Sequence, residues 1–195
     1  MSSFIDNKTD STNTNEISIE NINELKEKEK EKSQIESISL SISTILEELL
    51  IQNRNLSLYK NKIYEQSKMV FSCRKKPKIS IIDYINRIIK YTYLEKSSLI
   101  ISLIYLDRIC QNDILLTDYN IHRLLLISII ISIKINEDQI FGNNYYAEVG
   151  GISIKEFNSI ERDFVTFINY YLFVTEEEFF KYKMYLEKYY LEIKK

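Results

Sequence analysis

The strongest hydrophobic pattern in the chain lies in residues 97–134, where two apolar runs are joined by a short polar connection. Between residues 119 and 133 nearly every position around a helical wheel is Ile or Leu, which predicts a helix enclosed on all sides. Lipid is disfavoured as the surrounding medium, because residues such as Asp107 and Arg123 interrupt the runs before the about 20 residues that a membrane span needs. The two runs therefore predict the buried centre of an all-α domain.

Amphipathic segments flank this centre on both sides. Apolar residues alternate at spacings of three and four in residues 35–49, 79–89, 157–168 and 179–193, so each segment predicts a helix with one face packed on the core. Two capping boxes mark helix starts, one at Ser153 with Glu156 and one at Thr175 with Glu178. The sequence between the central pair and the first box, NEDQIFGNNYYAEVGG, is expected to be a loop. About five helices are thus predicted after one preceding helix.

The chain is expected to divide into four segments. Residues 1–33 are polar and poor in apolar residues, which predicts a disordered low-complexity tail and leaves room only for a frayed, charge-paired helix at its end. Residues 34–66 are expected to contain an N-terminal docking helix, residues 67–78 a basic linker, and residues 79–195 the main helical domain. The linker carries the cluster CRKKPK, which is typical of a solvated connection and also fits a nuclear address or a phosphate contact.

Composition narrows the class of protein. Apolar residues make up 45% of the chain and there are only three Gly and one Pro, which favours long helices over a many-turned β fold. With 26 basic and 28 acidic side chains, the net charge of −2 gives no electrostatic reason to expect nucleic acid or an anionic membrane as the main partner. Two cysteines are too few for a disulfide framework, and no signal peptide is recognised, so an intracellular location is expected.

Catalytic chemistry finds no support in the sequence. His122 is the only histidine, and without a partner His or Glu at metal-ligand spacing it is expected at the surface or as a cap. Glycine-rich phosphate loops, nucleophile motifs and paired carboxylates are also missing. We therefore expect a protein that is not an enzyme and that needs no metal, no cofactor and no small-molecule substrate.

Three charged residues fall on apolar faces. Asp107 lies in a helix that is apolar almost all round, so it is expected to be buried and paired with a basic residue of the preceding helix, Arg87 or Lys78. Glu161 lies within the stripe of residues 157–168, and Lys134 closes the most buried helix. These two either pair with each other inside the fold or stand at the rim of a surface that binds a partner's backbone groups.

Several motifs together resemble one known family. PKISIIDYINRIIKY, LIYLDRI, NIHRLLLISIIISIK and NNYYAEVGGISIKEFNSIERDF, followed by VTEEEF and KYKMYLE, resemble the cyclin box of the P-type or U-type cyclins, which are related to phosphate-signalling cyclins. The similarity runs from about residue 44 to 190, which is roughly three quarters of the chain. It implies a cyclin fold with one five-helix box and a preceding N-terminal helix.

The resemblance also implies a function and a site. Cyclins are regulatory subunits that bind a cyclin-dependent protein kinase, and Lys134 and Glu161 match the lysine and glutamate that hold the kinase main chain. Glu137 and Asp138 match the acidic residues that follow this lysine, whereas Ile135 replaces the common aromatic residue. Asp107 matches the family's buried structural aspartate. The docking patch of cell-cycle cyclins is not recognised in the first box helix.

Three functions remain in competition. The first is a regulatory subunit that binds and allosterically activates a cyclin-dependent serine/threonine protein kinase, in the nucleus, the cytoplasm or both. The second is a scaffold that binds a kinase without activating it. The third is a cyclin-fold adaptor linked to transcription, which the near balance of charge disfavours.

Overall fold

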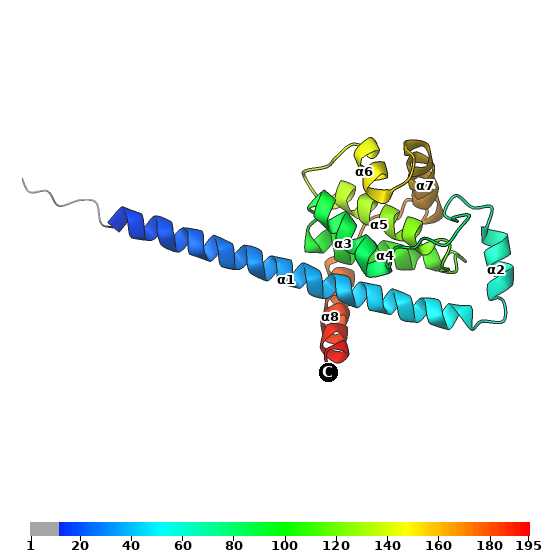
Figure 1. The fold of residues 1–195 in the computed structure, drawn as a ribbon, viewed down its shortest axis with the longest axis horizontal. Helices are drawn as coiled ribbons and strands as arrows, with labels where there is room; N and C mark the ends of the chain where they lie inside the picture. Colours follow the sequence, from blue (N-terminus) through cyan, green and yellow to red (C-terminus); the bar gives the residue numbers. More distant parts are fainter. Residues whose placement is uncertain (1–11) are drawn as a thin grey trace, which may run out of the picture. The chain divides into compact units, whose positions relative to one another are not determined.

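Helices form all the regular structure that this computed structural model describes, which covers the backbone of residues 12–195 and the side chains of residues 23–195. The all-α class expected from the sequence is confirmed over this part of the chain. The helices, labelled in Figure 1, are α1 (Thr12–Arg54), α2 (Tyr59–Gln66), α3 (Ile81–Thr92), α4 (Lys96–Cys110), α5 (Ile121–Asn136), α6 (Asn143–Gly150), α7 (Ile154–Phe167) and α8 (Glu176–Ile193).

Helices α4 and α5 form the centre of the fold (Figure 1), as the two apolar runs predict. Helix α5 contacts α3, α4, α6 and α7, and its residues 124–133 are all buried. Helices α4 and α5 approach closely where both carry serine. The Ser132 hydroxyl donates a hydrogen bond of 2.7 Å to the backbone oxygen of Ser98 on the facing helix. A helix that is apolar all round is therefore enclosed by protein.

The chain divides into two compact units, Met1–Gln34 and Ile35–Lys195. In the second unit, α1 packs through the predicted apolar face, where Ile38 and Ile42 are buried and Ile35 is partly buried. The buried Ser41 hydroxyl also donates to the backbone oxygen of Leu186 in α8, at 3.2 Å. The N-terminal helix and the C-terminal helix are thus joined by a direct hydrogen bond.

The N-terminal half differs from the sequence expectation in two places. The structure continues α1 back to Thr12, whereas the sequence predicts a disordered tail over residues 1–33, of which residues 1–11 lie outside the described residues. The alternating Glu and Lys of residues 26–32 place opposite charges three residues apart, which supports a helix, but they also place like charges four residues apart, which opposes it. The docking helix expected in residues 34–66 ends at Arg54, and α2 follows as a separate short helix.

The segment after α5 is more ordered than the sequence suggests. Residues 143–150, expected to belong to a loop, form α6, and Gly151 ends that helix with a φ of 70°, which glycine adopts at little cost. Tyr146 and Val149 are buried against the core, and this packing stabilises a helix too short to form by itself. Residues 79–195 therefore contain six helices, α3–α8, one more than the about five that the sequence predicts.

Candidate functional site

The two charged residues singled out from the sequence, Lys134 and Glu161, lie next to each other where three helices meet. Lys134 is in the last turn of α5 and Glu161 is in the middle of α7. The Lys134 ammonium donates hydrogen bonds to Glu161 Oε1 and to Oδ1 of Asn143, the first residue of α6. Asn143 in turn donates through Nδ2 to Glu161 Oε2, at 3.0 Å. A closed network therefore ties α5, α6 and α7 together.

The network is only partly shielded from solvent. The side chains of Lys134 and Glu161 keep 23% and 22% of their surface exposed. The ammonium lies 5.7 Å from the ring centre of Phe157 and 5.9 Å from that of Tyr146, so aromatic faces lie beside its inner side. An ammonium has three donors and a carboxylate about four acceptor positions, and the network uses two of each. One donor and further acceptor capacity remain for a partner's peptide group.

Asn143 is the member of this network that sequence reasoning missed. It was assigned to a loop, and only the packing of α6 places its amide between the two charges. Its Nδ2 also donates to Asn158 Oδ1 at 2.8 Å, which fixes the amide orientation. The available signal was the pair of asparagines at residues 143 and 144, which form the start of α6 directly after Gly142.

The two acidic residues that follow Lys134 occupy different positions. Glu137 is partly buried, and its Oε1 accepts a hydrogen bond of 3.0 Å from the backbone nitrogen of Glu95, the residue that precedes α4. Asp138 is exposed. Glu137 thus anchors the start of α4, while the Asp138 carboxylate is accessible at the surface.

An apolar hollow of about 440 Å³ lies between the end of α5 and the segment that leads into α8. Ile135 and Asn136, the residues after Lys134, form one wall, and the segment between α7 and α8 forms another. Ile135 is 55% exposed and Phe173 is 71% exposed. Large apolar side chains that remain open to solvent beside a polar pair are typical of a protein-binding surface.

The expected buried pair of Asp107 with Arg87 is wrong, because both side chains are exposed. Asp107 Oδ2 instead accepts a hydrogen bond of 2.7 Å from the Tyr182 hydroxyl of α8, and Arg87 donates to the backbone oxygen of Glu148, at 3.2 Å. The buried charge of α4 is the next residue, Arg108, whose side chain is 8% exposed and whose Nη2 lies 2.7 Å from Glu178 Oε2. Neighbouring residues on a helix differ by about 100° in direction, so Arg108 can face the interior while Asp107 faces solvent. An apolar sequence around both residues does not show which of the two is buried.

His122 is also buried, contrary to the expected surface or capping position. Its Nε2 lies 2.9 Å from the backbone oxygen of Ile79, and its ring packs edge-on against Tyr84. Burial lowers the pKa of the imidazole below its ordinary value of 6.5, although the contact with Ile79 opposes this shift. The Nδ1 atom has no hydrogen-bond partner in the described structure, and the ring is part of the packed interior.

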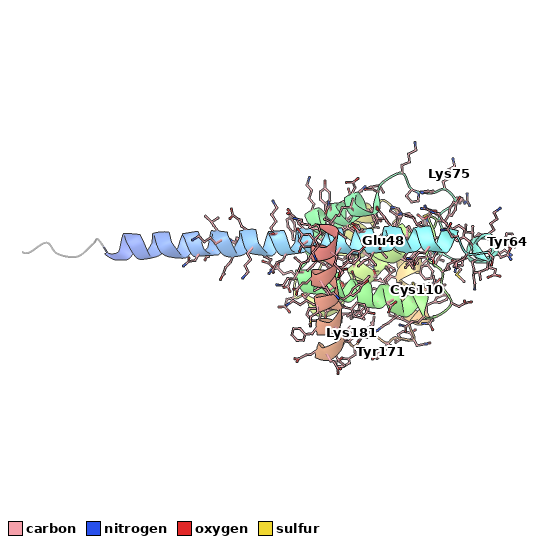
Figure 2. The ribbon with its side chains drawn as sticks, turned by 90° about the horizontal axis from the view of Figure 1, so that it is seen from below. Glu48, Tyr64, Lys75, Cys110, Tyr171 and Lys181 are labelled. Atoms are coloured by element: carbon pink, nitrogen blue, oxygen red, sulfur yellow. The ribbon has the colours of Figure 1, made fainter. Side chains whose placement is uncertain are left out.

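The basic cluster of residues 74–78 lies in the loop between α2 and α3, and Figure 2 shows Lys75 projecting away from the fold. Lys76 is held to Asp118 at 2.7 Å, and Arg54 binds the same carboxylate. In the part of the chain that the structure describes, no His, Cys, Asp and Glu side chains gather in a group that could hold a metal ion. Within the same range, no helix combines the length and the apolar character that crossing a membrane requires.

Comparison with known proteins places this arrangement in a family. The cyclin family model matches residues 6–172. The chain is 39% identical over 121 residues to Cyclin-U4-1 of Arabidopsis thaliana, a match that covers 61% of this chain and 60% of the relative. It is 34% identical over 151 residues to Cyclin-U2-1 of the same plant, covering 75% of this chain and 66% of the relative.

A similar match is found in a second plant. The chain is 35% identical over 148 residues to Cyclin-P3-1 of Oryza sativa subsp. japonica, covering 75% of this chain and 62% of the relative. The chain therefore matches about 60% to 66% of the length of these curated relatives. The helical architecture, the family match and the agreement with U-type and P-type members lead to one conclusion: the chain belongs to the cyclin family, in the group of the U-type and P-type cyclins.

Proposed function

We propose that this chain is a regulatory subunit that binds a cyclin-dependent serine/threonine protein kinase and activates it allosterically. The observation that carries the proposal is the partly exposed pair of Lys134 and Glu161, together with an apolar hollow whose wall includes Ile135, the residue after Lys134. In cyclins, the counterparts of these residues hold the main chain of the kinase. Membership of the family and this geometry support the same partner.

The chemistry of the pair suits a peptide group. The remaining N–H of Lys134 can donate to a main-chain carbonyl, while a free lone pair of Glu161 accepts from a main-chain N–H. Charge-assisted hydrogen bonds of this kind are shorter and stronger than neutral ones. The hollow lined by Ile135 and Phe173 receives apolar side chains of the same kinase segment. Polar contacts thus set register, and apolar burial supplies affinity.

Activation follows from differential binding. A kinase is active when its catalytic Lys and its mobile-helix Glu pair and its activation loop is open. A surface that binds the mobile helix only in that position shifts the population toward the active state. The chain then contributes no reacting group, and we propose Glu137 and Asp138 as further kinase contacts next to the pair.

The test uses the full chain, a panel of purified cyclin-dependent kinases and a histone-type substrate. We expect one or more kinases to bind and to phosphorylate the substrate only in the complex. Reversal variants Lys134→Glu and Glu161→Lys are expected to weaken binding about 30-fold or more, because truncating or reversing one member of a close interfacial charge pair costs about 2 kcal/mol or more. Helicity by circular dichroism is expected to stay unchanged.

The double variant Lys134→Glu with Glu161→Lys separates a binding role from a structural role. It restores an internal ion pair but presents the two charges in exchanged places, so we expect the stability to equal that of wild type and kinase binding to remain weak. Full recovery of binding would show that the pair acts only inside the fold. The matched control is Lys188 with Glu192, an exposed pair of α8 at 4.0 Å, whose reversal is expected to leave binding unchanged.

The two rival functions give different outcomes in the same assays. A kinase that binds but stays inactive would identify a scaffold. A transcription-linked adaptor would bind no kinase and would retain nucleic acid with an affinity that falls as salt rises. We propose the activating function because the paired charges fit a peptide partner, whereas the net charge of −2 does not favour a phosphate backbone.

A further inference from the structure

The segment between α7 and α8 is held by side chains of a third helix, α4. Residues 168–175 have no regular secondary structure, yet three successive carbonyl oxygens accept hydrogen bonds from Tyr105 and Arg108. Arg108 Nη1 donates to Tyr171 O at 2.9 Å, Tyr105 Oη to Leu172 O at 2.7 Å, and Arg108 Nη2 to Phe173 O at 3.0 Å. An extended segment with three captured carbonyls cannot shift along the helix without losing all of these bonds.

Arg108 is fixed in this position from several sides. Its side chain is buried, its Nη2 pairs with Glu178 in the first turn of α8, and its guanidinium lies 4.1 Å from the ring centre of Tyr171. Tyr171 is labelled in Figure 2. A planar guanidinium can serve two carbonyls and a carboxylate at once, which a lysine cannot do with the same geometry. We call Tyr105 and Arg108 together the carbonyl clamp.

The backbone before the clamp is in an unfavourable conformation. Asn169 and Tyr170 both have positive φ values, 52° and 58°, a region that asparagine tolerates but that a residue as large as tyrosine rarely adopts. Such conformations persist only where the surroundings determine them. Here local backbone hydrogen bonds from Asn169 N to Thr166 O, 3.0 Å, and from Tyr170 N to Val165 O, 2.9 Å, hold the two residues, and the clamp extends the restraint to residues 171–173.

The side chain that the clamp presents is Phe173. Its backbone is bound by Arg108, but its phenyl ring is 71% exposed and forms part of the wall of the apolar hollow beside Ile135. An exposed aromatic ring on a mobile loop would lose side-chain and backbone freedom on binding, which lowers affinity. Because the clamp already fixes the backbone of Phe173, little backbone freedom is lost on binding.

We propose that Tyr105 and Arg108 are positioning residues that preorganise Phe173 as a binding contact, an inference that rests on the kinase-binding function proposed above. The clamp itself touches no partner. It raises the affinity for the kinase by holding the backbone of residues 171–173 in the conformation that binds. Its effect on binding therefore requires the Phe173 side chain. This dependence distinguishes positioning from a general contribution to stability.

The test is a double-mutant cycle in the full chain, because coupling between two residues appears as a departure from additivity. Tyr105→Phe removes one donor and keeps the ring, and Phe173→Ala removes an exposed side chain. We expect Tyr105→Phe to weaken kinase binding roughly three- to tenfold with Phe173 present. In the Phe173→Ala background we expect the same change to have almost no effect. Equal loss in both backgrounds would overturn the proposal.

Tyr84→Phe is the matched control for this cycle. The Tyr84 hydroxyl also donates to a backbone oxygen, that of Gly150 at 3.0 Å, but it joins α3 to α6 away from the hollow. We expect Tyr84→Phe to lower thermal stability about as much as Tyr105→Phe and to leave affinity unchanged. A similar loss of affinity in the control would mean that stability, and not positioning, determines binding.

Hydrogen exchange tests the clamp without a partner. In Tyr105→Phe and Arg108→Lys, backbone amides of residues 169–175 are expected to exchange faster, while those of α5 keep their rates. Unchanged exchange in residues 169–175 would overturn the clamp. If the wild-type chain binds no kinase in the panel, the proposed function is wrong, and the positioning role that rests on it is wrong as well. If the wild-type chain binds but the cycle is additive, only the positioning role fails.

Discussion

Lys134 at the end of α5 and Glu161 in the middle of α7 form an ion pair that also holds the amide of Asn143 at the start of α6. One contact thus joins three helices of the fold at a single point. Because the two side chains remain 23% and 22% exposed, the pair differs from a fully buried charge pair and stays accessible to a partner. Its contribution to folding is expected to be small compared with its contribution to binding.

The first prediction measures that contribution to folding. Lys134→Met removes the ammonium and leaves Glu161 with Asn143 as its partner, so we expect the free energy of unfolding to fall by about 1 kcal/mol. Urea unfolding monitored by circular dichroism measures the change, with an unaltered m-value. A loss of about 4 kcal/mol would mark the pair as a structural element of the core instead.

The second prediction contrasts two adjacent residues of α4. Arg108→Met leaves Glu178 and two backbone oxygens without their donor, so we expect a loss of about 3 kcal/mol or more in unfolding free energy. Asp107→Asn affects an exposed carboxylate that accepts from Tyr182, and it should cost less than about 1 kcal/mol. Thermal melting of the two variants provides the comparison. The opposite order would favour Asp107 as the structural charge.

The third prediction concerns acid stability and Asp118. Partial burial opposes ionisation of this carboxyl, but hydrogen bonds from Arg54 and Lys76 prevail and lower its pKa from 3.8 to about 2. A carboxyl with a lowered pKa in the folded state stabilises the fold above its unfolded pKa and loses this effect as pH falls from about 4 to 2. We expect Asp118→Asn to be less stable than wild type by about 1 to 2 kcal/mol at pH 7.

Urea unfolding of wild type and Asp118→Asn between pH 7 and pH 2 tests this expectation. The difference in unfolding free energy should narrow below pH 4 and nearly vanish near pH 2. A difference that stays constant over this range would contradict the assigned linkage.

The fourth prediction uses the single histidine of the chain. Burial lowers the pKa of His122, so the folded state binds the proton less readily than the unfolded state. Stability is therefore fully present above pH 6.5 and decreases as pH falls below it. An NMR titration of the only imidazole resonances should give a midpoint below 6.5. A midpoint above 6.5 would place His122 in a solvated or acidic environment.

The fifth prediction concerns the packing of α6 on α5. A Cβ atom added at Gly150 would lie 2.3 Å from Leu126 Cδ2, so Gly150→Ala must displace a buried side chain. We expect a loss of about 1 to 3 kcal/mol, as for other overpacked cores. Gly142→Ala is the control, because no atom lies within 4 Å of the added Cβ, and differential scanning calorimetry compares the two. Equal melting temperatures would show that α6 moves away at little cost.

The capping boxes show where local sequence rules hold and where they are overridden. At α7 the full box forms: the Ser153 hydroxyl accepts from the backbone N–H of Glu156, and the Glu156 carboxylate accepts from that of Ser153. At α8 only the Thr175 hydroxyl caps its helix, because the Glu178 carboxylate pairs with Arg108 of α4 instead. A stronger charged partner from a distant segment replaced the local one.

Residue type and spacing were enough to predict the all-helical class, the buried centre made by α4 and α5, and the two charged residues of the candidate site. Helical periodicity decides these features, since a face or a whole helix of Ile and Leu must be buried wherever the chain goes. The family resemblance added the expected roles of Lys134 and Glu161. Both results depend on residue type and spacing, which are local properties of the chain.

Packing between helices, in contrast, fixes which of two neighbouring residues faces inward and which distant groups meet. Arg108 rather than Asp107 is buried, because the direction of a side chain depends on how α4 packs against α8. Helix α6, the amide of Asn143 between two charges, and the clamped carbonyls of residues 171–173 likewise depend on contacts between segments far apart in sequence. A short helix, an ion pair or an irregular segment has too little local preference to fix its own geometry, so its surroundings determine it.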